Sequence, residues 1–277
     1  MPNTPKTPKY RIGDFSHFTG VSPDFLKHYE EHGLLKVQVS ESGYRYYTFE
    51  QTARIIEYLR LKNYGVSVKE MNALLQHSPD GAFDILNTKV EQLEEQIEHM
   101  QAVVDEQRRL YTWYQARREH PLEWEIAQTE PYLFLFHSRN KDFIKDPEIY
   151  AILNDWFAWL PVVKSALYLC ARDETPTYDL YWGLAVPESV AKRYRLPMSS
   201  AVKRLEFGKA FTFHFFNIEA AFTISMIEQG KHPGFKQLKK LGFPRAKNGL
   251  LINDLRLSSA EGVSRYAMGR LILSLTD

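Results

Sequence analysis

Residues 10–79 alternate short amphipathic helices with turn signals. Apolar residues recur at helical spacing, and we expect helices over Ile12–Phe18, Asp24–His32, Thr48–Asn63 and Ser67–His77. Thr19-Gly20 closes the first helix, and Ser22-Pro23 supplies an N-cap and a first-turn proline for the second. Two helices joined by such a short glycine-containing turn indicate a helix-turn-helix.

A β-hairpin is predicted directly after these two helices. Ser42-Gly43 is a turn signal, and the aromatic run Tyr44–Tyr47 that follows it suits an extended strand. A hairpin in this place is a wing. A winged helix-turn-helix sets its second helix in the major groove of DNA.

The next region, residues 80–119, holds a long heptad pattern. Its apolar positions alternate at spacings of four and three: Leu86, Val90, Leu93, Ile97, Met100 and Val104. A stripe this narrow and long favours a coiled coil with a second subunit. The alternative is an ordinary amphipathic helix packed on its own domain.

Residues 121–277 mix aromatic-rich strands with helices, and Pro121 marks the joint. The order is β-α-β-β followed by β-α-β-β, which suggests a duplicated unit, although the sequence contains no direct repeat. The expected strands and helices are 132–136, 149–160, 166–171, 180–186, 202–216 (a strand pair), 220–229, 250–257 and 268–275.

Composition narrows the classes of function. Hydrophobic residues make up 44% and charged residues 25%, and the net charge of +1 gives no overall attraction to a polyanion. One cysteine, Cys170, excludes an internal disulfide and a cysteine-built metal cage. The sequence has no nucleotide, zinc or nucleophile motif, so we expect neither catalysis nor a metal or other cofactor. Residues 1–9 suit a disordered arm rather than a secretory signal, no stretch suits a membrane span, and a cytoplasmic location is expected.

DNA contact therefore has to rest on local placement. Lys27 and His28 lie on the second helix, Arg45 on the wing and Lys62 near the end of the third helix. Basic side chains neutralise phosphates, and tyrosine hydroxyls can hydrogen-bond to them. Acidic residues lie on the same helix, so charge alone is a weak argument.

A chain of short motifs in this region resembles the N-terminal domain of the MerR family. The motifs run Tyr10–Asp14, Thr19–Ser22, Tyr29-Glu30, Gly33–Leu35, Gly43–Tyr47 and Gly65–Ser67. The resemblance implies a homodimer, joined by antiparallel pairing of the long helix, that distorts promoter DNA used by RNA polymerase. The DNA-contact candidates are Ser22, Lys27, His28, Tyr29, Tyr44, Arg45, Tyr46 and Lys62.

The C-terminal region is similar to GyrI-like effector-binding domains, on its element order, the strand 182–186 and an aromatic interior. The fold class is then multidomain, α and α+β. The resemblance implies a pocket for a small aromatic or cationic molecule, with a buried acid as countercharge. The candidates are Trp156, Tyr168, Tyr181, Trp182, Phe213 and Asp254, with Glu206 or Asp179 as other acids. Each aromatic can equally be core, and two other functions stay open: a hydrolase using a base such as His214, or a protein-interaction module.

Overall fold

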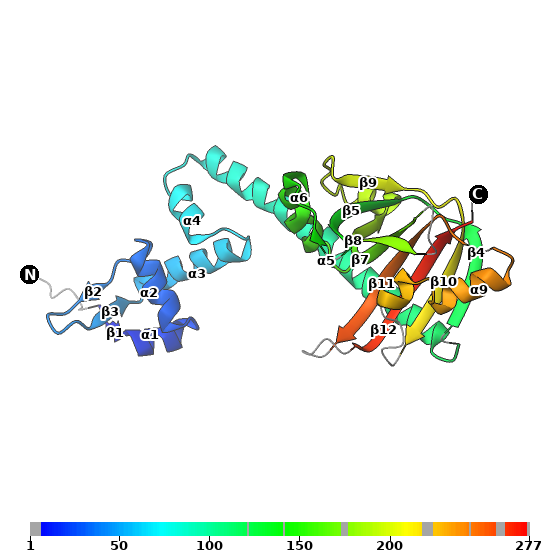
Figure 1. Cartoon of the computed structure of the whole chain (residues 1–277). Helices are drawn as coiled ribbons and strands as arrows, with labels where there is room; N and C mark the ends of the chain where they lie inside the picture. Colours follow the sequence, from blue (N-terminus) through cyan, green and yellow to red (C-terminus); the bar gives the residue numbers. More distant parts are fainter. Residues whose placement is uncertain are drawn as a thin grey trace, which may run out of the picture. The chain divides into compact units, whose positions relative to one another are not determined.

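The computed structural model describes residues 7–120, 122–140, 142–172, 177–217, 224–243, 245–258 and 264–275. The chain divides into two compact units, Met1–Glu98 and His99–Asp277 (Figure 1). Pro121, the predicted joint, lies outside the described residues.

The first unit is a small helical domain with a three-stranded antiparallel sheet in the order β1-β3-β2. Its elements are β1 (Lys9–Arg11), α1 (Ile12–Thr19), α2 (Pro23–Glu31), β2 (Gln38–Val39), β3 (Arg45–Thr48), α3 (Glu50–Asn63) and α4 (Val68–Leu74). The predicted helices and the wing hairpin are present. Strand β1 pairs with β3, and it includes Lys9 of the arm predicted to be disordered.

Local sequence signals fix these elements. Gly20 has a φ of 71°, which a residue without a Cβ adopts without strain, and it ends α1. Ser67 and Glu70 form a capping box at the start of α4. The core behind the helices includes Phe15, stacked on Tyr47 at a ring-centroid distance of 4.8 Å.

Helix α5 (Pro79–Arg117) is a single 39-residue helix. Leu86 packs against the core of the first unit. The remaining heptad positions are exposed on this helix: Val90, Leu93, Ile97, Met100 and Val104. The helix predicted as a separate segment, 80–119, therefore belongs partly to each unit, because Ala102 and Trp113 near its C-terminal end are buried.

The second unit is an antiparallel sheet with the strand order β4-β10-β12-β11-β7-β8-β5-β6, and β9 also pairs with β5. Its strands are β4 (Leu122–Gln128), β5 (Tyr132–Arg139), β6 (Asp142–Phe143), β7 (Lys164–Ala171), β8 (Tyr178–Pro187), β9 (Val202–Leu205), β10 (Lys209–Asn217), β11 (Asn248–Ser258) and β12 (Ser264–Ser274). Its other helices are α6 (Pro147–Ala158), α7 (Glu188–Arg193), α8 (Ile224–Glu228) and α9 (Pro233–Lys240).

The two halves of this sheet have matching strand orders. The first half runs β5, α6, β7, β8 along the chain, and its strands lie in the order β5-β8-β7 in the sheet. The second half runs β10, α8, α9, β11, β12, and its strands lie in the order β10-β12-β11. The two halves join where β7 pairs with β11. Gly183 and Gly269 lie on the middle strand of each half. A Cβ added at Gly183 would lie 2.1 Å from the Leu135 backbone oxygen, and one added at Gly269 would lie 2.3 Å from the Ile252 backbone oxygen. Both positions therefore require glycine.

The sequence missed some elements here. Strands β4 and β6 and helices α7 and α9 were not predicted, and residues 220–223 of the helix expected at 220–229 lie outside the described residues. On one face of the sheet α6 and α9 contribute to two apolar clusters. The opposite face receives the C-terminal part of α5, where Trp113 Nε1 donates to His214 Nδ1 at 3.4 Å.

Candidate DNA-binding surface and ligand pocket

Helix α2 is held in place by its N-terminal cap and by its buried inner face. Its N-cap Ser22 accepts a hydrogen bond from the Phe25 backbone N–H at 3.1 Å, with Pro23 in the first turn. Leu26 and Tyr29 anchor its inner face in the core. The cap oxygen of Ser22 is therefore engaged within the helix, and the outward face of α2 is what remains for a partner.

That outward face carries two of the predicted contacts. Lys27 and His28 are exposed, and Lys27 makes only a 3.4 Å surface ion pair with Asp24. Such an exposed pair contributes little, so Lys27 can exchange Asp24 for a phosphate at small cost. Lys62 on α3 is also exposed and lies 6.0 Å from the Phe25 ring centroid.

Arg45 ties the wing to α2. Its Nε donates to the Glu30 carboxylate at 2.7 Å, and this pairing raises the Arg45 pKa further. The side chain is still 40% exposed, so part of the guanidinium faces solvent. Arg45 therefore fixes the angle between the wing and α2, and any phosphate contact uses its exposed portion. The sequence did not predict this pair, because the two residues are 15 positions apart.

Tyr29, another of the predicted contacts, is largely buried. Tyr29 is 3% exposed, and its ring stacks on Phe25 at 4.0 Å. It is a core residue here, and its burial raises its pKa. The ring packs inward with the apolar residues of this helix, and a phosphate contact by the Tyr29 hydroxyl stays a prediction. Tyr46 is half-buried.

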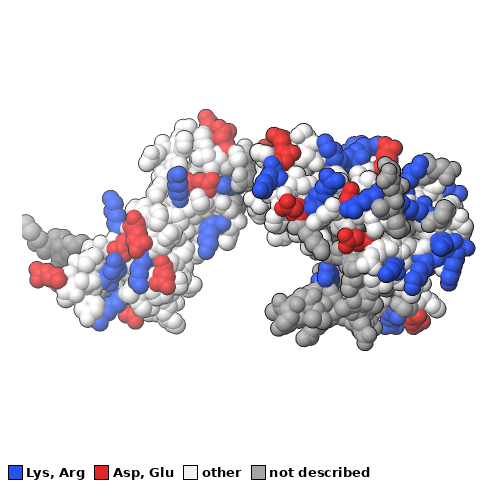
Figure 2. Space-filling view, in the orientation of Figure 1, with Lys and Arg blue, Asp and Glu red and all other residues white. Residues whose placement is uncertain are grey.

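Tyr44 at the wing tip is 51% exposed, and the Arg11 guanidinium lies 4.6 Å from its ring centroid. Sequence reasoning missed Arg11, which reaches the wing because β1 pairs with β3. Basic and acidic side chains are intermixed over the first unit (Figure 2). The surface is thus locally rather than broadly basic.

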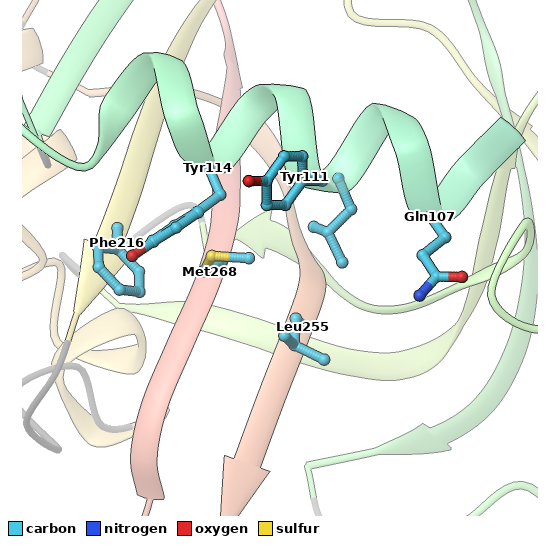
Figure 3. Close-up of a pocket in the computed structure, with 7 residues that line it drawn as sticks. Gln107, Tyr111, Tyr114, Phe216, Leu255 and Met268 are labelled. Carbon is cyan, nitrogen blue, oxygen red and sulfur yellow. The ribbon is translucent and has the colours of Figure 1, made fainter. Parts of the chain in front are cut away.

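In the second unit a cavity of about 490 Å³ lies between α5 and the sheet. Tyr111 and Tyr114 project from α5 toward Met268 and Phe216, with Leu255 beneath (Figure 3). The Tyr114 and Phe216 rings meet edge to face at 5.5 Å. Gln107 and Leu110 complete the lining. A volume of this size suits a small organic molecule.

A buried ionic cluster lies beside this pocket. Asp254 sits at a β-bulge next to Leu255, and it accepts a hydrogen bond from Arg109 at 2.9 Å. The Lys164 ammonium lies 3.8 Å from Asp254 and hydrogen-bonds to Glu106. Arg270 is 4.0 Å from the same Asp254 oxygen.

Burial alone would raise the pKa of Asp254, but Arg270, Lys164 and Arg109 hold it below its ordinary value. The pKa of Glu106 is likewise lowered, because Arg109 and Lys164 outweigh its burial. Both carboxylates therefore stay ionised, and each already has cationic partners. Asp254, predicted to be the countercharge for a ligand, lies at the centre of this cluster with three cationic partners, and its role toward a ligand stays a prediction.

The six predicted effector residues do not all lie at one site; only Tyr168 and Tyr181 line the same cavity. Tyr168 and Tyr181 line a separate cavity of about 350 Å³ with Phe136 and Cys170. Phe213 belongs to the core under α9, and Trp182 packs against that core while donating to Ser165 at 3.0 Å. Trp156 lies on α6, is fully buried and donates to the Pro197 carbonyl at 2.9 Å. Phe213 and Trp156 are therefore core residues. The Phe213 side chain points to the sheet face away from α5, and Trp156 packs from α6 into the apolar cluster on that face.

His214, the possible base of a hydrolase, is 6% exposed. Its Nδ1 accepts from Trp113, and its Nε2 lies 3.3 Å from Glu125. Burial lowers its pKa. This arrangement holds the ring between two partners and places it in the packing under α5.

Among the described residues, no group of three or more histidine, cysteine or acidic side chains is placed to hold a metal ion. In the same portion of the chain, no helix combines the length and apolar character needed to cross a bilayer.

Residues 10–78 match the family described as MerR HTH family regulatory protein. The chain is 30% identical over 95 residues to nodulation protein NolA of Bradyrhizobium elkanii, an alignment covering 34% of this chain and 43% of that protein. It is 30% identical over 93 residues to the multidrug-efflux transporter 2 regulator of Bacillus subtilis, covering 33% and 34%. The chain thus spans less than half the length of these curated relatives.

Among solved structures, the chain is similar to EcmrR in its complex with DNA, at 12% identity and a TM-score of 0.32, over 96% of this chain and 98% of that one. Residues 10–78, which match the MerR HTH family description, form the helix-turn-helix region, and a long helix and an antiparallel α+β unit follow them.

Proposed function

We propose that the chain is a homodimeric, MerR-type transcription regulator that binds promoter DNA through α2 and the wing. The observation that carries this proposal is the family match at residues 10–78 together with the exposed Lys27, His28 and Tyr44 on those two elements. Arg45 and Lys62 add cationic groups that can neutralise phosphates. Relatives named as regulators support the same role.

The dimer follows from α5. Its heptad positions Val90, Leu93, Ile97, Met100 and Val104 are exposed, although such a stripe is stable only when a second helix covers it. Antiparallel pairing with α5 of a second copy covers this stripe and brings two DNA-binding units to one duplex.

The second unit is the sensor in this proposal. Its matching strand orders, 5-8-7 and 10-12-11, support a duplicated βαββ unit of the GyrI-like kind. The pocket between α5 and the sheet receives a small aromatic effector. Because α5 forms one wall of that pocket, an occupant contacts the helix that also carries the dimer stripe. The bound form then distorts the promoter for RNA polymerase in the cytoplasm.

Titration of the full chain against labelled DNA from its own upstream region, at two salt concentrations, tests this proposal. We expect binding that weakens steeply with salt and that Arg45→Ala reduces about tenfold or more. Arg108→Ala is the matched control, because Arg108 is an exposed arginine on α5 in the second unit. Equal affinity for random DNA, or equal losses in both variants, would contradict the proposal.

A further inference from the structure

The ionic cluster beside the α5 pocket has more positive than negative charge. Its anions are Asp254 and Glu106, and its cations are Arg109, Lys164 and Arg270. The Asp254 side chain is 2% exposed and that of Lys164 is 7% exposed. Burial lowers the Lys164 pKa, yet even a neutral Lys164 leaves two arginines against two carboxylates. The cluster therefore never presents a net negative charge to a ligand.

The cluster and the pocket are adjacent on one face of the sheet. Met268 lines the pocket, and Arg270 follows two residues later on β12, on the same face. The neighbouring strand repeats this arrangement, since Phe216 pairs with Met268 and His214 pairs with Arg270. On α5, Leu110 lines the pocket directly after Arg109.

Arg270 also has one hydrogen-bond donor without an acceptor among the described residues. Its Nε is buried, and no acceptor among the described residues lies within hydrogen-bond distance. A buried N–H without a partner is costly and rare in native structures, so this donor calls for an acceptor. An anionic oxygen at the Arg270 end of the pocket would accept this hydrogen bond and offset the excess positive charge.

The rest of the pocket favours a flat ring. Tyr111, Tyr114 and Phe216 offer aromatic faces and edges, and Met268 offers a polarizable thioether. The lining has no carboxylate of its own among the described residues. The ring and the charge are thus recognised by different parts of the same site.

We propose that the α5 pocket binds an aromatic molecule carrying a carboxylate or similar anionic group, with the ring between Tyr111, Tyr114 and Phe216 and the anion toward Arg270. This inference rests on the proposed function only in treating the pocket as the effector site. It replaces the cationic effector that the GyrI resemblance implies. Aromatic cations are disfavoured because both carboxylates of the cluster are already paired and its cations outnumber its anions.

Three naphthalene compounds of similar size test the charge preference: 2-naphthoate, 2-naphthamide and 2-naphthylmethylammonium. Isothermal titration calorimetry with the full chain, without DNA and at one ionic strength, gives the three affinities. We expect 2-naphthoate to bind about tenfold or more tightly than the neutral amide, and the ammonium compound to bind most weakly. Tightest binding of the ammonium compound, equal affinities, or no binding of 2-naphthoate at millimolar concentration would overturn the inference.

Variants then locate the anion. Arg270→Gln removes one cation and the buried Nε donor, and we expect 2-naphthoate to lose about tenfold in affinity while the amide keeps its own. Arg108→Gln is the control on α5, and both variants are checked for folding by thermal unfolding. An unchanged preference in a folded Arg270→Gln variant would overturn the placement; if that variant does not fold, the ranking in the unmodified chain still decides the charge preference.

The two proposals fail separately. Loss of DNA binding with the anion preference intact would remove the regulator role, whereas a cation preference in a chain that binds its upstream DNA would remove only this inference.

Discussion

Ile97 on α5 offers a direct test of the dimer. It is 66% exposed in the single chain, in the middle of the apolar stripe. Ile97→Gln keeps a good helix former at this position and replaces the branched apolar group with an amide. The change therefore alters the seam between two α5 helices rather than the stability of the helix itself.

The magnitude follows from the exposed area. Complete burial of an isoleucine side chain stabilises by about 1.5–3 kcal/mol, and about two-thirds of the Ile97 surface is left for a partner to cover. A two-fold dimer buries this residue twice, so the substitution costs about 2–4 kcal/mol of association free energy. That loss raises the dimer Kd by roughly 30-fold to 1000-fold.

Sedimentation equilibrium over a wide concentration range measures this Kd. We expect the unmodified chain to sediment at twice its 32.4 kDa mass, and the variant to dissociate at concentrations where the parent stays paired. Glu95→Gln, an exposed residue beside the stripe, is the control and should leave the Kd nearly unchanged. A monomeric parent, or an Ile97→Gln variant that dimerises as tightly as its parent, would refute the reasoning.

Two further substitutions concern the second unit. Trp156→Phe removes the buried hydrogen bond to Pro197. We expect urea titrations to show an unfolding free energy lower by about 1–3 kcal/mol, with an unchanged affinity for 2-naphthoate. A changed affinity would indicate that Trp156 contacts the ligand. Burial lowers the pKa of His232 to about 4, below its unfolded value of 6.5, so its contribution to stability is full above pH 6.5 and is lost as the pH falls toward 4. We expect about 2 kcal/mol of this to be lost between pH 7 and pH 5. In His232→Asn, which can still cap α9, we expect the unfolding free energy to fall by correspondingly less between pH 7 and pH 5. The same pH dependence in the variant and its parent would show that His232 is not the source of the loss.

The sequence predicted best what neighbouring residues decide. The turn at Gly20 and the cap at Ser22 depend on contacts within a few positions, and both are present. The strand β4 was missed because its residues gain their place only by pairing with β10, more than 80 positions later. The periodicity of apolar residues within a segment does not indicate which distant strand pairs with it.

In the candidate sites, too, the sequence predicted local features and missed those that depend on distant contacts. Lys27, His28 and Tyr44 were predicted from their elements and are exposed. The ionic cluster could not be predicted, because Arg109 and Asp254 are 145 positions apart and meet only when α5 packs on the sheet. Trp156 and Phe213 were chosen for their aromatic character, which is common to cores and ligand sites. Composition gives no indication of the sheet face on which a ring lies.

Hydroxyl-radical footprinting of the full chain on its upstream DNA tests the central claim most directly. A dimer with two α2–wing units predicts protection of two half-sites related by two-fold symmetry, and Arg45→Ala weakens both equally. Protection of one asymmetric segment, or none above the level of unrelated DNA, would contradict the account of a dimeric DNA-binding regulator.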